Sequence, residues 1–366
     1  MRIAIIGMGL IGGSVALRLR DAMPDADVAG FDPDAGAARA ATDRGAVTEW
    51  ASSAAAAVRG ADVVVLALPV DRIPAACRDV AAAVEPDAVV TDVGSAKADV
   101  VAAGEGAFGG RFVGGHPMAG SERHGMDAAH AGLFDDAWWI LTPTPTTSSA
   151  AYATVAQLVS ALGARPVAVA PEVHDGLVAR LSHVPQLAAS AVVAAAAAGG
   201  GRGELLHLAG AGFRDVTRIA ASNPDTWVGI VRANRPAVLE ALRRFRDRLD
   251  DVDRMVAGGR WDELGGWLAA ARRARLELLV KPAWGGQPVT LGLPVPDRPG
   301  VLADVAGVAA SLGVNLEDVR IVHSTEGGRG RIELVVDGDA SADLLAKALR
   351  DAGHLVERSA VDVASS

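Results

Sequence analysis

The residues with the clearest chemical potential near the amino terminus are glycines. Gly7, Gly9 and Gly12 follow an apolar β-like run and open a segment of helical periodicity that begins with Leu10 and Ile11. Glycines at this spacing permit a tight turn, close approach of a pyrophosphate to the backbone, and packing of the helix on the strand. The phosphates then bind the free N–H groups at the helix start. We therefore predict a dinucleotide site at these five residues, with a purely structural turn as the alternative.

An acidic residue indicates which dinucleotide to expect. Asp32 ends the second apolar run, twenty residues after Gly12, where a carboxylate would bind the 2′-hydroxyl group of a ribose. The same charge would repel a 2′-phosphate, and no arginine follows it closely, so the pattern favours NAD over NADP. Pro69 follows a later run, Val63–Leu68, at the sheet edge where loops that contact the cofactor lie. An ordinary strand end explains Pro69 equally well.

Three polar segments, at 92–97, 115–122 and 213–220, supply the other candidate residues. The first two follow predicted strands, so their side chains should emerge at the sheet edge that holds the dinucleotide. The third should face them across an interdomain cleft. A histidine such as His116 ordinarily titrates near neutral pH, which suits proton transfer. Arg218 carries a planar guanidinium group that suits a bidentate grip on a carboxylate.

Each of these residues also has a simpler structural interpretation. His116 precedes Pro117 and could be a core or turn histidine. The Gly-Ser sequence that ends at Ser95 could be turn chemistry alone. Arg218 could form a surface ion pair with Asp215, three residues earlier on one helical face.

Together, the glycine turn and the polar segments resemble the prephenate/arogenate dehydrogenase family over essentially the whole chain. The motifs VGSAK, HPMAGSE and RDVTRIAASNP occur here in that family's order. The resemblance implies an NAD-dependent oxidative decarboxylation in cytoplasmic tyrosine biosynthesis. The substrate would be prephenate, giving 4-hydroxyphenylpyruvate, or arogenate, giving tyrosine.

The resemblance also implies roles for individual residues. His116 matches the catalytic histidine, which must be uncharged to accept a hydrogen bond from the C4 hydroxyl group of the substrate. Ser95 matches the serine that orients this hydroxyl group and approaches the nicotinamide. Arg218 matches the arginine that binds the ring carboxylate, and Asp215 would hold that arginine in place.

Four further residues match positions of the family's substrate site. Glu122 would lie near the cleft entrance and Trp227 would line the site, although a solvated glutamate and a buried helix tryptophan are nearly as good interpretations. Ser182 and Gln186 share a segment in which many relatives carry histidine at the second position, in contact with the substrate side chain. A neutral amide accepts a hydrogen bond from the ammonium group of arogenate without the repulsion of a protonated histidine. We therefore hypothesise a preference for arogenate, with dual specificity open.

The periodicity of the sequence predicts the elements that position these residues. Residues 1–170 alternate apolar runs with Ala-rich amphipathic segments, which predicts an α/β, Rossmann-type domain with a doubly wound parallel sheet. Helical periodicity then predicts an all-helical domain over 171–283 for substrate binding and dimerisation. In it, Asn223-Pro224 reads as a helix start, Pro236 as a break, and 187–201 as a buried helix with a glycine stop.

A Pro- and Gly-rich linker introduces a third predicted domain at 284–366. Its runs fit a ferredoxin-like β-α-β-β-α-β unit, and parts of it resemble the amino-acid-sensing ACT module. In such modules an amino acid often binds between two copies, near the loop after the first strand, which implicates Asp297, Gly300 and Asn315. We predict feedback inhibition by tyrosine, and phenylalanine or tryptophan could substitute.

Composition argues against several other classes of function. The net charge of −9, without a local basic run, makes nucleic acid or an anionic membrane an improbable partner. The single cysteine, Cys77, permits no internal disulfide, and the eight histidines show no metal-ligand spacing, so no metal is expected. Glycines interrupt any signal-peptide helix, and 187–201 is too short to span a bilayer. With the resemblance, these features predict a cytoplasmic homodimer.

Two other functions stay open at this stage. One is a different dehydrogenase with a Rossmann domain and a helical domain, such as a β-hydroxyacid dehydrogenase, which uses a lysine after a glycine-rich helix start. The only lysines here, Lys97, Lys281 and Lys347, are not so placed. The other is an amino-acid sensor that has lost turnover, and the presence of the catalytic-type histidine, serine and arginine argues against it.

Overall fold

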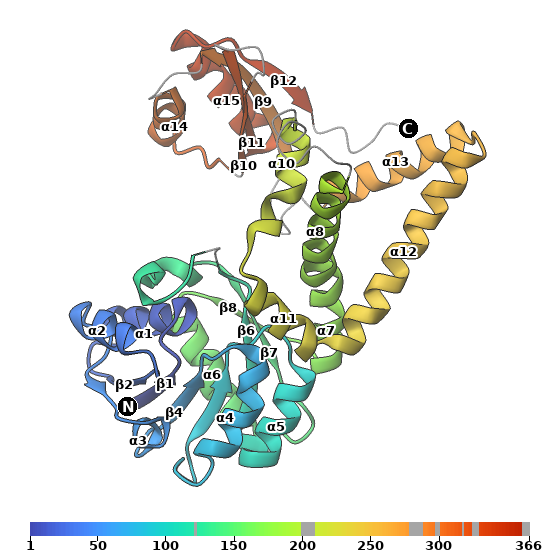
Figure 1. Ribbon diagram of the computed structural model, residues 1–366. Coiled ribbons are helices and arrows are strands. Elements are labelled where there is room, and N and C mark those ends of the chain that lie inside the picture. Colours follow the sequence, from blue (N-terminus) through green and yellow to red (C-terminus); the bar gives the residue numbers. More distant parts are fainter. Residues whose placement is uncertain are drawn as a thin grey trace. The chain divides into compact units, whose positions relative to one another are not determined.

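The computed structural model describes residues 1–120, 123–198, 209–277, 288–296, 301–316, 318–323 and 329–360 (Figure 1). The chain divides into two compact units, Met1–Asp247 and Arg248–Ser366. The division falls inside one long helix, α12 (Arg235–Ala257).

The amino-terminal unit contains an eight-stranded sheet in the order β3-β2-β1-β4-β5-β6-β7-β8. The direction of winding reverses between β1 and β4, which is the topology of a doubly wound dinucleotide-binding sheet. Its strands are β1 (Arg2–Ile6), β2 (Asp27–Phe31), β3 (Glu49–Trp50), β4 (Val63–Leu66), β5 (Val89–Asp92), β6 (Phe112–Pro117), β7 (Trp138–Thr142) and β8 (Arg165–Ala168).

The prediction of a wholly parallel sheet was wrong at two strands, because β7 runs antiparallel to β6 and β8 runs parallel to β7. Parallel neighbours need a long crossover, usually a helix, that returns the chain to the opposite edge. The described residues between β6 and β7 form only the short 3-10 turns η3 (Met126–Ala128) and η4 (Ala131–Phe134). The chain therefore re-enters the sheet from the edge at which β6 ends. The short strand β3 was also not predicted, since two residues show no alternation.

Helices cover both faces of this sheet, as its continuous apolar strands require. In β1, Ile3 and Ile5 belong to one core cluster while Ala4 and Ile6 belong to the other. The first cluster includes residues of α1, α2 and α6, and the second includes residues of α3, α4 and α5. These helices are α1 (Leu10–Ala22), α2 (Ala35–Asp43), α3 (Ala54–Val58), α4 (Ile73–Val80), α5 (Ala98–Phe108) and α6 (Ser149–Ala161).

After β8 the amino-terminal unit is helical. A π-helical turn, η5 (Ala179–His183), joins the first two helices into one continuous run. Pro185 follows this turn, and because proline lacks an N–H group and crowds the preceding turn, a widened π turn accommodates it. The elements are α7 (Pro171–Val178), α8 (Val184–Ala197), α10 (Ala211–Thr217), η6 (Arg218–Ala221), α11 (Pro224–Ala233) and α12.

Two predictions for this region are confirmed, namely the helix start at Asn223-Pro224 and the break at Pro236. Asn223 caps α11, where its side-chain oxygen accepts hydrogen bonds from the backbone N–H groups of Asp225 and Thr226. The helix then ends at Asn234, and α12 begins one residue before Pro236. The break lets Asn234 turn its side chain into the protein, where it is 2% exposed.

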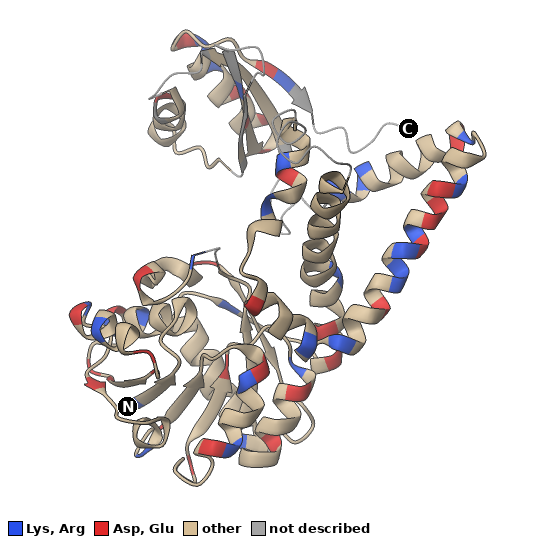
Figure 2. Ribbon diagram, in the orientation of Figure 1, with Lys and Arg blue, Asp and Glu red and all other residues tan. Residues whose placement is uncertain are grey.

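The prediction of a buried helix over 187–201 was wrong for residues 190–198, and residues 199–201 with the predicted glycine stop lie outside the described residues. Residues of α8 beyond Ala189 are mostly exposed, including Val192, although the helix carries no charged residue (Figure 2). The continuous run Pro171–Ala197 is also longer than predicted, and by length and composition alone it could cross a membrane. Its first turns carry the buried polar residues His174 and Asp175, which bond to the nucleotide-binding sheet and its loops.

The carboxy-terminal unit contains a four-stranded antiparallel sheet in the order β10-β11-β9-β12. This order and the intervening helices make a ferredoxin-like unit. Leu291 and Leu293 of β9 pack with Val305 and Leu345 in its core. Its elements after α12 are α13 (Trp261–Glu277), β9 (Pro288–Pro296), α14 (Val301–Ser311), β10 (Asp318–His323), β11 (Arg329–Asp337), α15 (Gly338–Asp351) and β12 (Glu357–Ala360). The predicted fold class is confirmed in both units.

Candidate active site

The glycine turn between β1 and α1 has the close contacts that its sequence predicts. Gly7 has a φ of +97°, and a Cβ atom added there would lie 2.3 Å from the carbonyl oxygen of Ala67. A Cβ atom at Gly12 would lie 1.9 Å from the carbonyl oxygen of Gly7. At Gly9, by contrast, no atom lies within 4 Å of such a Cβ position. The first and third glycines are therefore needed for packing, whereas the second keeps open space beside the turn.

The start of α1 and Asp32 complete a site that fits a dinucleotide. No side chain caps α1, whose first helical residues are Leu10 and Ile11, so its N–H groups stay available to a phosphate. Oδ2 of Asp32 accepts a hydrogen bond of 2.8 Å from the backbone N–H of Met8, which places the carboxylate beside the turn. Pro69 is exposed just after β4, at the same edge.

A buried ion pair holds together the ends of β5 and β6. Nζ of Lys97 is fully buried and donates hydrogen bonds to Asp92 and, at 2.7 Å, to the carbonyl oxygen of Gly115. Oδ1 of Asp92 in turn accepts the N–H of Gly115 at 3.0 Å. Burial lowers the pKa of Lys97, and the neighbouring Asp92 opposes this shift. Because these bonds fix the residue before His116, they fix the position of that histidine at the strand end.

A chain of hydrogen bonds continues from His116 into the helical region. Nδ1 of His116 lies 2.8 Å from Nε2 of His174, and Nδ1 of His174 lies 2.8 Å from Oδ1 of Asp175. The Asp175 carboxylate also accepts the backbone N–H groups of Lys97 and Ala98, at 2.7 and 2.9 Å. Burial raises the pKa of Asp175, but the hydrogen bonds from His174 and these N–H groups outweigh it and lower the pKa overall. The carboxylate is therefore ionised and bound by donors alone.

The surroundings of His116 favour its neutral form. Burial lowers its pKa well below the usual 6.5, and the neighbouring His174, Lys97 and His183 lower it further. An imidazole of this kind carries an unshared electron pair at neutral pH and can accept a proton.

A second buried histidine lies on the π turn. Nδ2 of Asn234 donates to the carbonyl oxygen of Asp175 at 2.9 Å and to Nδ1 of His183 at 3.2 Å. Because an amide nitrogen only donates, Nδ1 of His183 accepts and this ring is neutral. Burial lowers the pKa of His183 to about 4. Its ring also meets Trp227 edge-on, with the ring centroids 6.0 Å apart.

An open groove of about 650 Å³ lies beside this histidine, between α8, α11 and α12. Gln186, which is 5% exposed, and Trp227 both line it, together with apolar residues such as Val228 and Leu239. Ser182 is half-buried on the π turn, four residues before Gln186.

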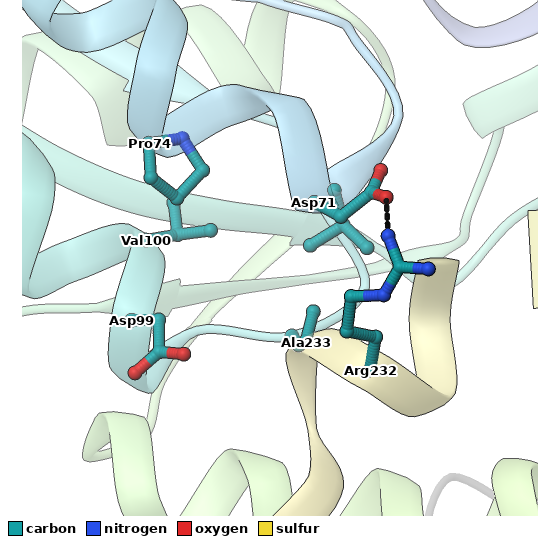
Figure 3. A pocket seen from close by; sticks show the side chains of 8 residues that line it. Asp71, Pro74, Asp99, Val100, Arg232 and Ala233 are labelled. Carbon is teal, nitrogen blue, oxygen red and sulfur yellow. Dashed lines mark hydrogen bonds and ion pairs between the residues drawn. The ribbon is translucent and has the colours of Figure 1, made fainter. Parts of the chain in front are cut away.

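A smaller cavity of about 160 Å³ lies between η1 (Val70–Arg72), α4, α5 and α11. Asp71 and Arg232 point toward one another across it and form an ion pair of 3.4 Å (Figure 3). Gly229 of α11 approaches the same carboxylate, because a Cβ atom there would lie 3.2 Å from Asp71. None of the predicted site residues lines this cavity, so we assign it to contact between the sheet and the helical region.

Within the described residues, several other predicted ones take no part in the contacts given above. Arg218 and Asp215 are exposed, and no ion pair connects them in the part of the chain that the structure describes. Ser95 is half-buried in the loop between β5 and α5. Asn315 is exposed just before β10. Three more, Glu122, Asp297 and Gly300, lie outside the described residues.

Known proteins match the chain in all three predicted regions. Residues 15–168 match the nucleotide-binding domain of prephenate dehydrogenase, residues 170–270 match its dimerisation domain, and residues 291–354 match an AHAS small subunit-like ACT domain. Prephenate dehydrogenase of Bacillus subtilis is 32% identical over 343 residues, which cover 92% of each chain. This chain belongs to the prephenate dehydrogenase family.

Solved structures agree with this assignment. Prephenate dehydrogenase from A. aeolicus, in complex with hydroxyphenyl propionate and NAD+, aligns with a TM-score of 0.72 and 30% identity over 76% of this chain and 98% of its own. Arogenate dehydrogenase from Synechocystis aligns with a TM-score of 0.67 and 30% identity over 76% of this chain and 100% of its own. The predicted family, the oxidoreductase class and the NAD cofactor are thereby confirmed.

Within this prephenate dehydrogenase fold, sequence reasoning missed four buried polar residues: His174, Asp175, His183 and Asn234. A signal for the first two was present, since a histidine and an aspartate stand side by side near the start of a segment with helical periodicity. The structure brings them against His116, which the sequence alone could not indicate. Among the described residues, no group of three or more histidine, cysteine or acidic side chains could hold a metal ion.

Proposed function

We propose that this member of the prephenate dehydrogenase family oxidises and decarboxylates prephenate, arogenate or both, with NAD as the hydride acceptor. The observation that carries the proposal is the position of His116. It lies at the end of β6, at the sheet edge that also carries the dinucleotide turn, and the low pKa of its ring keeps it neutral. The NAD complex of the A. aeolicus relative supports the same cofactor here.

The chain's own residues would perform the proton transfer. When NAD is bound at the glycine turn, it supplies an acceptor for the hydride that leaves C4 of the substrate. His116 accepts the proton of the C4 hydroxyl group, and Ser95 orients that hydroxyl group. The C–O bond becomes a carbonyl, and loss of carbon dioxide from C1 then makes the ring aromatic, with the electron pair of the broken bond passing to the C4 oxygen. The imidazolium of His116 returns its proton to that oxygen, which completes the phenol. Proton transfer to a placed base of this kind typically contributes about 10²–10⁴-fold to the rate.

The remaining predicted residues would bind the substrate. Arg218 would grip the ring carboxylate and Asp215 would orient it, and their exposure allows both to close on the ligand. Trp227 and Ser182 would line the site, and Glu122 would lie at its entrance. Gln186 would face the substrate side chain. Because its amide is uncharged, it favours the ammonium group of arogenate, and we propose arogenate as the better substrate.

The carboxy-terminal ACT-like domain would regulate the enzyme. We propose that tyrosine binds there through Asp297, Gly300 and Asn315 and inhibits turnover. Tyrosine should raise the melting temperature of the full chain as its concentration exceeds its dissociation constant. Phenylalanine and tryptophan are the comparison ligands. If no aromatic amino acid changes either the melting temperature or the rate, this assignment is wrong.

The assembly and location follow from the same family. The match to a dimerisation domain and the exposed apolar residues of α8 support a homodimer. We place the enzyme in the cytoplasm, with no nucleic acid or membrane partner. We also propose domain boundaries at 1–170, 171–283 and 284–366, and the family matches over 15–168 and 170–270 support a first boundary near residue 170.

The central test is a direct assay of NAD reduction. The purified chain is mixed with NAD and either prephenate or arogenate, and NADH absorbance is followed over time. The parent and a His354→Gln control, altered in the carboxy-terminal unit, should both turn over. His116→Ala should lower kcat by about 10²–10⁴-fold with little change in NAD affinity. Absence of NADH formation by the parent with both substrates would overturn the proposal and favour a non-catalytic sensor.

A further inference from the structure

The contacts of His116 also determine which of its two ring nitrogens carries the proton. In the part of the chain that the structure describes, the hydrogen-bond partner of this ring is Nε2 of His174, which lies 2.8 Å from Nδ1 of His116. His174 is fully buried, and its other nitrogen, Nδ1, faces Oδ1 of Asp175 at 2.8 Å. The protonation of one ring is thus coupled to that of the next.

The direction of these bonds follows from the carboxylate. An ionised carboxylate accepts hydrogen bonds and donates none, so Nδ1 of His174 must carry a hydrogen toward Asp175. In a neutral ring the other nitrogen, Nε2, then holds an unshared pair and accepts. Nδ1 of His116 must consequently donate to it. The neutral His116 ring is left with its unshared pair on Nε2, for which none of the described residues provides a hydrogen-bond partner.

The Asp175 carboxylate is itself held in place. The backbone N–H groups of Lys97 and Ala98, at the start of α5, bond to its two oxygens, and its carbonyl oxygen accepts from Asn234. Asp175 therefore cannot rotate away from His174 without breaking bonds to α5. In general, the orientation of a catalytic imidazole depends on the partner of its second nitrogen. Here His174 is that partner for His116.

We propose that His174 and Asp175 are positioning residues that hold His116 in the tautomer with hydrogen on Nδ1, so that Nε2 accepts the hydroxyl proton of the substrate. The catalytic part of this proposal rests on the proposed dehydrogenase function, whereas the tautomer of His116 can be measured without turnover. When the hydroxyl proton reaches Nε2, His116 becomes an imidazolium whose Nδ1–H still bonds to His174. No further proton transfer to Asp175 is required.

The tautomer is tested by NMR of the full-length protein labelled with ¹⁵N-histidine. The His116 signals are identified by their loss in His116→Ala. In the parent, Nδ1 of His116 should have the chemical shift of a protonated nitrogen and Nε2 that of an unprotonated one. In His174→Phe, which fills the space without an acceptor, this preference should weaken or reverse. Protonated Nε2 in the neutral parent ring would overturn the proposal.

Kinetics of two variants separate positioning from packing. His174→Gln keeps a carbonyl that can accept from His116 and an amide N–H that can donate to Asp175, whereas His174→Phe keeps neither. We expect His174→Phe to lower kcat by about 10²-fold or more, with KM nearly unchanged, and His174→Gln to recover most of the loss. Circular dichroism and NAD affinity check that both variants fold. Equal activity of the two folded variants would contradict the positioning role.

The two sets of measurements also separate this inference from the proposed function. If the parent reduces no NAD with either substrate, the proposed function fails, and the NMR result still decides the tautomer. If the parent is active and the tautomer is as expected, but folded His174→Phe keeps parental kcat, the catalytic role of His174 is overturned. His354→Gln again serves as the matched histidine control and should change neither readout.

Discussion

Nδ2 of Asn234 lies 3.2 Å from Nδ1 of His183 and 2.9 Å from the carbonyl oxygen of Asp175. One side chain at the break between α11 and α12 thus ties the π turn to the helix that carries the His116 partners. The amide uses both of its hydrogens in these bonds, so a protonated His183 would have to break one of them. The pKa of His183, lowered to about 4 by burial, agrees with this geometry.

This arrangement predicts that His183 makes the protein less stable in acid. Its pKa rises from about 4 in the folded chain to the usual 6.5 on unfolding. The unfolded state therefore binds more protons between these values, and the free energy of unfolding falls as pH decreases from 6.5 toward 4. The shift corresponds to at most about 3 kcal/mol. Denaturant unfolding of the parent and His183→Gln at several pH values measures this loss of stability. If the free energy of unfolding depends on pH equally in the two proteins, the prediction is wrong.

The low pKa of His116 predicts the acid limb of the rate profile. Its neutral ring accepts the substrate proton, so activity is lost only where the ring becomes protonated. Because its pKa is well below 6.5, kcat/KM should stay nearly constant as pH falls from about 8 to about 6 and decline at lower values. The measurement uses both substrates, so that a substrate ionisation can be recognised. A half-maximal rate at or above pH 6.5 on the acid side would be inconsistent with this assignment.

Substitutions at two glycines of the cofactor turn should have different effects, one on the affinity for NAD and the other on thermal stability. Gly9→Val places a side chain in open space, so folding should be preserved while the dissociation constant for NAD rises at least about tenfold. Gly7→Ala adds a Cβ against the carbonyl oxygen of Ala67 at a φ of +97°. It should lower the melting temperature by about 2 °C or more. Thermal melting measures the stability of the two variants, and titration with NAD measures their dissociation constants. Loss of stability in Gly9→Val alone would reverse this assignment.

Gln186 should influence the choice between the two substrates. Gln186→His introduces a group that can be positively charged, which would repel the ammonium group of arogenate and attract the carboxylate of prephenate. We expect the ratio of kcat/KM for arogenate over prephenate to fall about tenfold, equivalent to about 1.4 kcal/mol. Gln157→His, on the exposed surface of α6, is the matched control. An unaltered ratio in Gln186→His would exclude this residue as the determinant.

The sequence was most informative where local rules determine the structure. The strands of the sheet have continuous apolar runs, and the glycine spacing places a turn between β1 and α1, so both were predicted at nearly their observed positions. The antiparallel pairing of β7 was not predicted, because strand direction depends on the path of the connecting segment and not on apolar periodicity.

The site was only partly predictable for a similar reason. His116 stands in a recognisable motif, whereas His174 and Asp175 lie almost sixty residues later in a helical stretch without a motif of this kind. Their relevance depends on a contact between distant segments. The predicted partnership of Arg218 with Asp215 used helical spacing. Because α10 ends at Thr217 and a 3-10 turn begins at Arg218, this spacing alone does not determine how the two side chains lie.

The bonds from Asp175 to the start of α5 have a consequence for how the chain matures during synthesis. A polypeptide released after Ala170 would contain the whole cofactor sheet, yet the N–H groups of Lys97 and Ala98 would lack their acceptor and His116 its neighbour. The Rossmann portion alone would therefore emerge from the ribosome with its reactive ring unaligned. Competence for chemistry would arise only once α7 has been made and has docked.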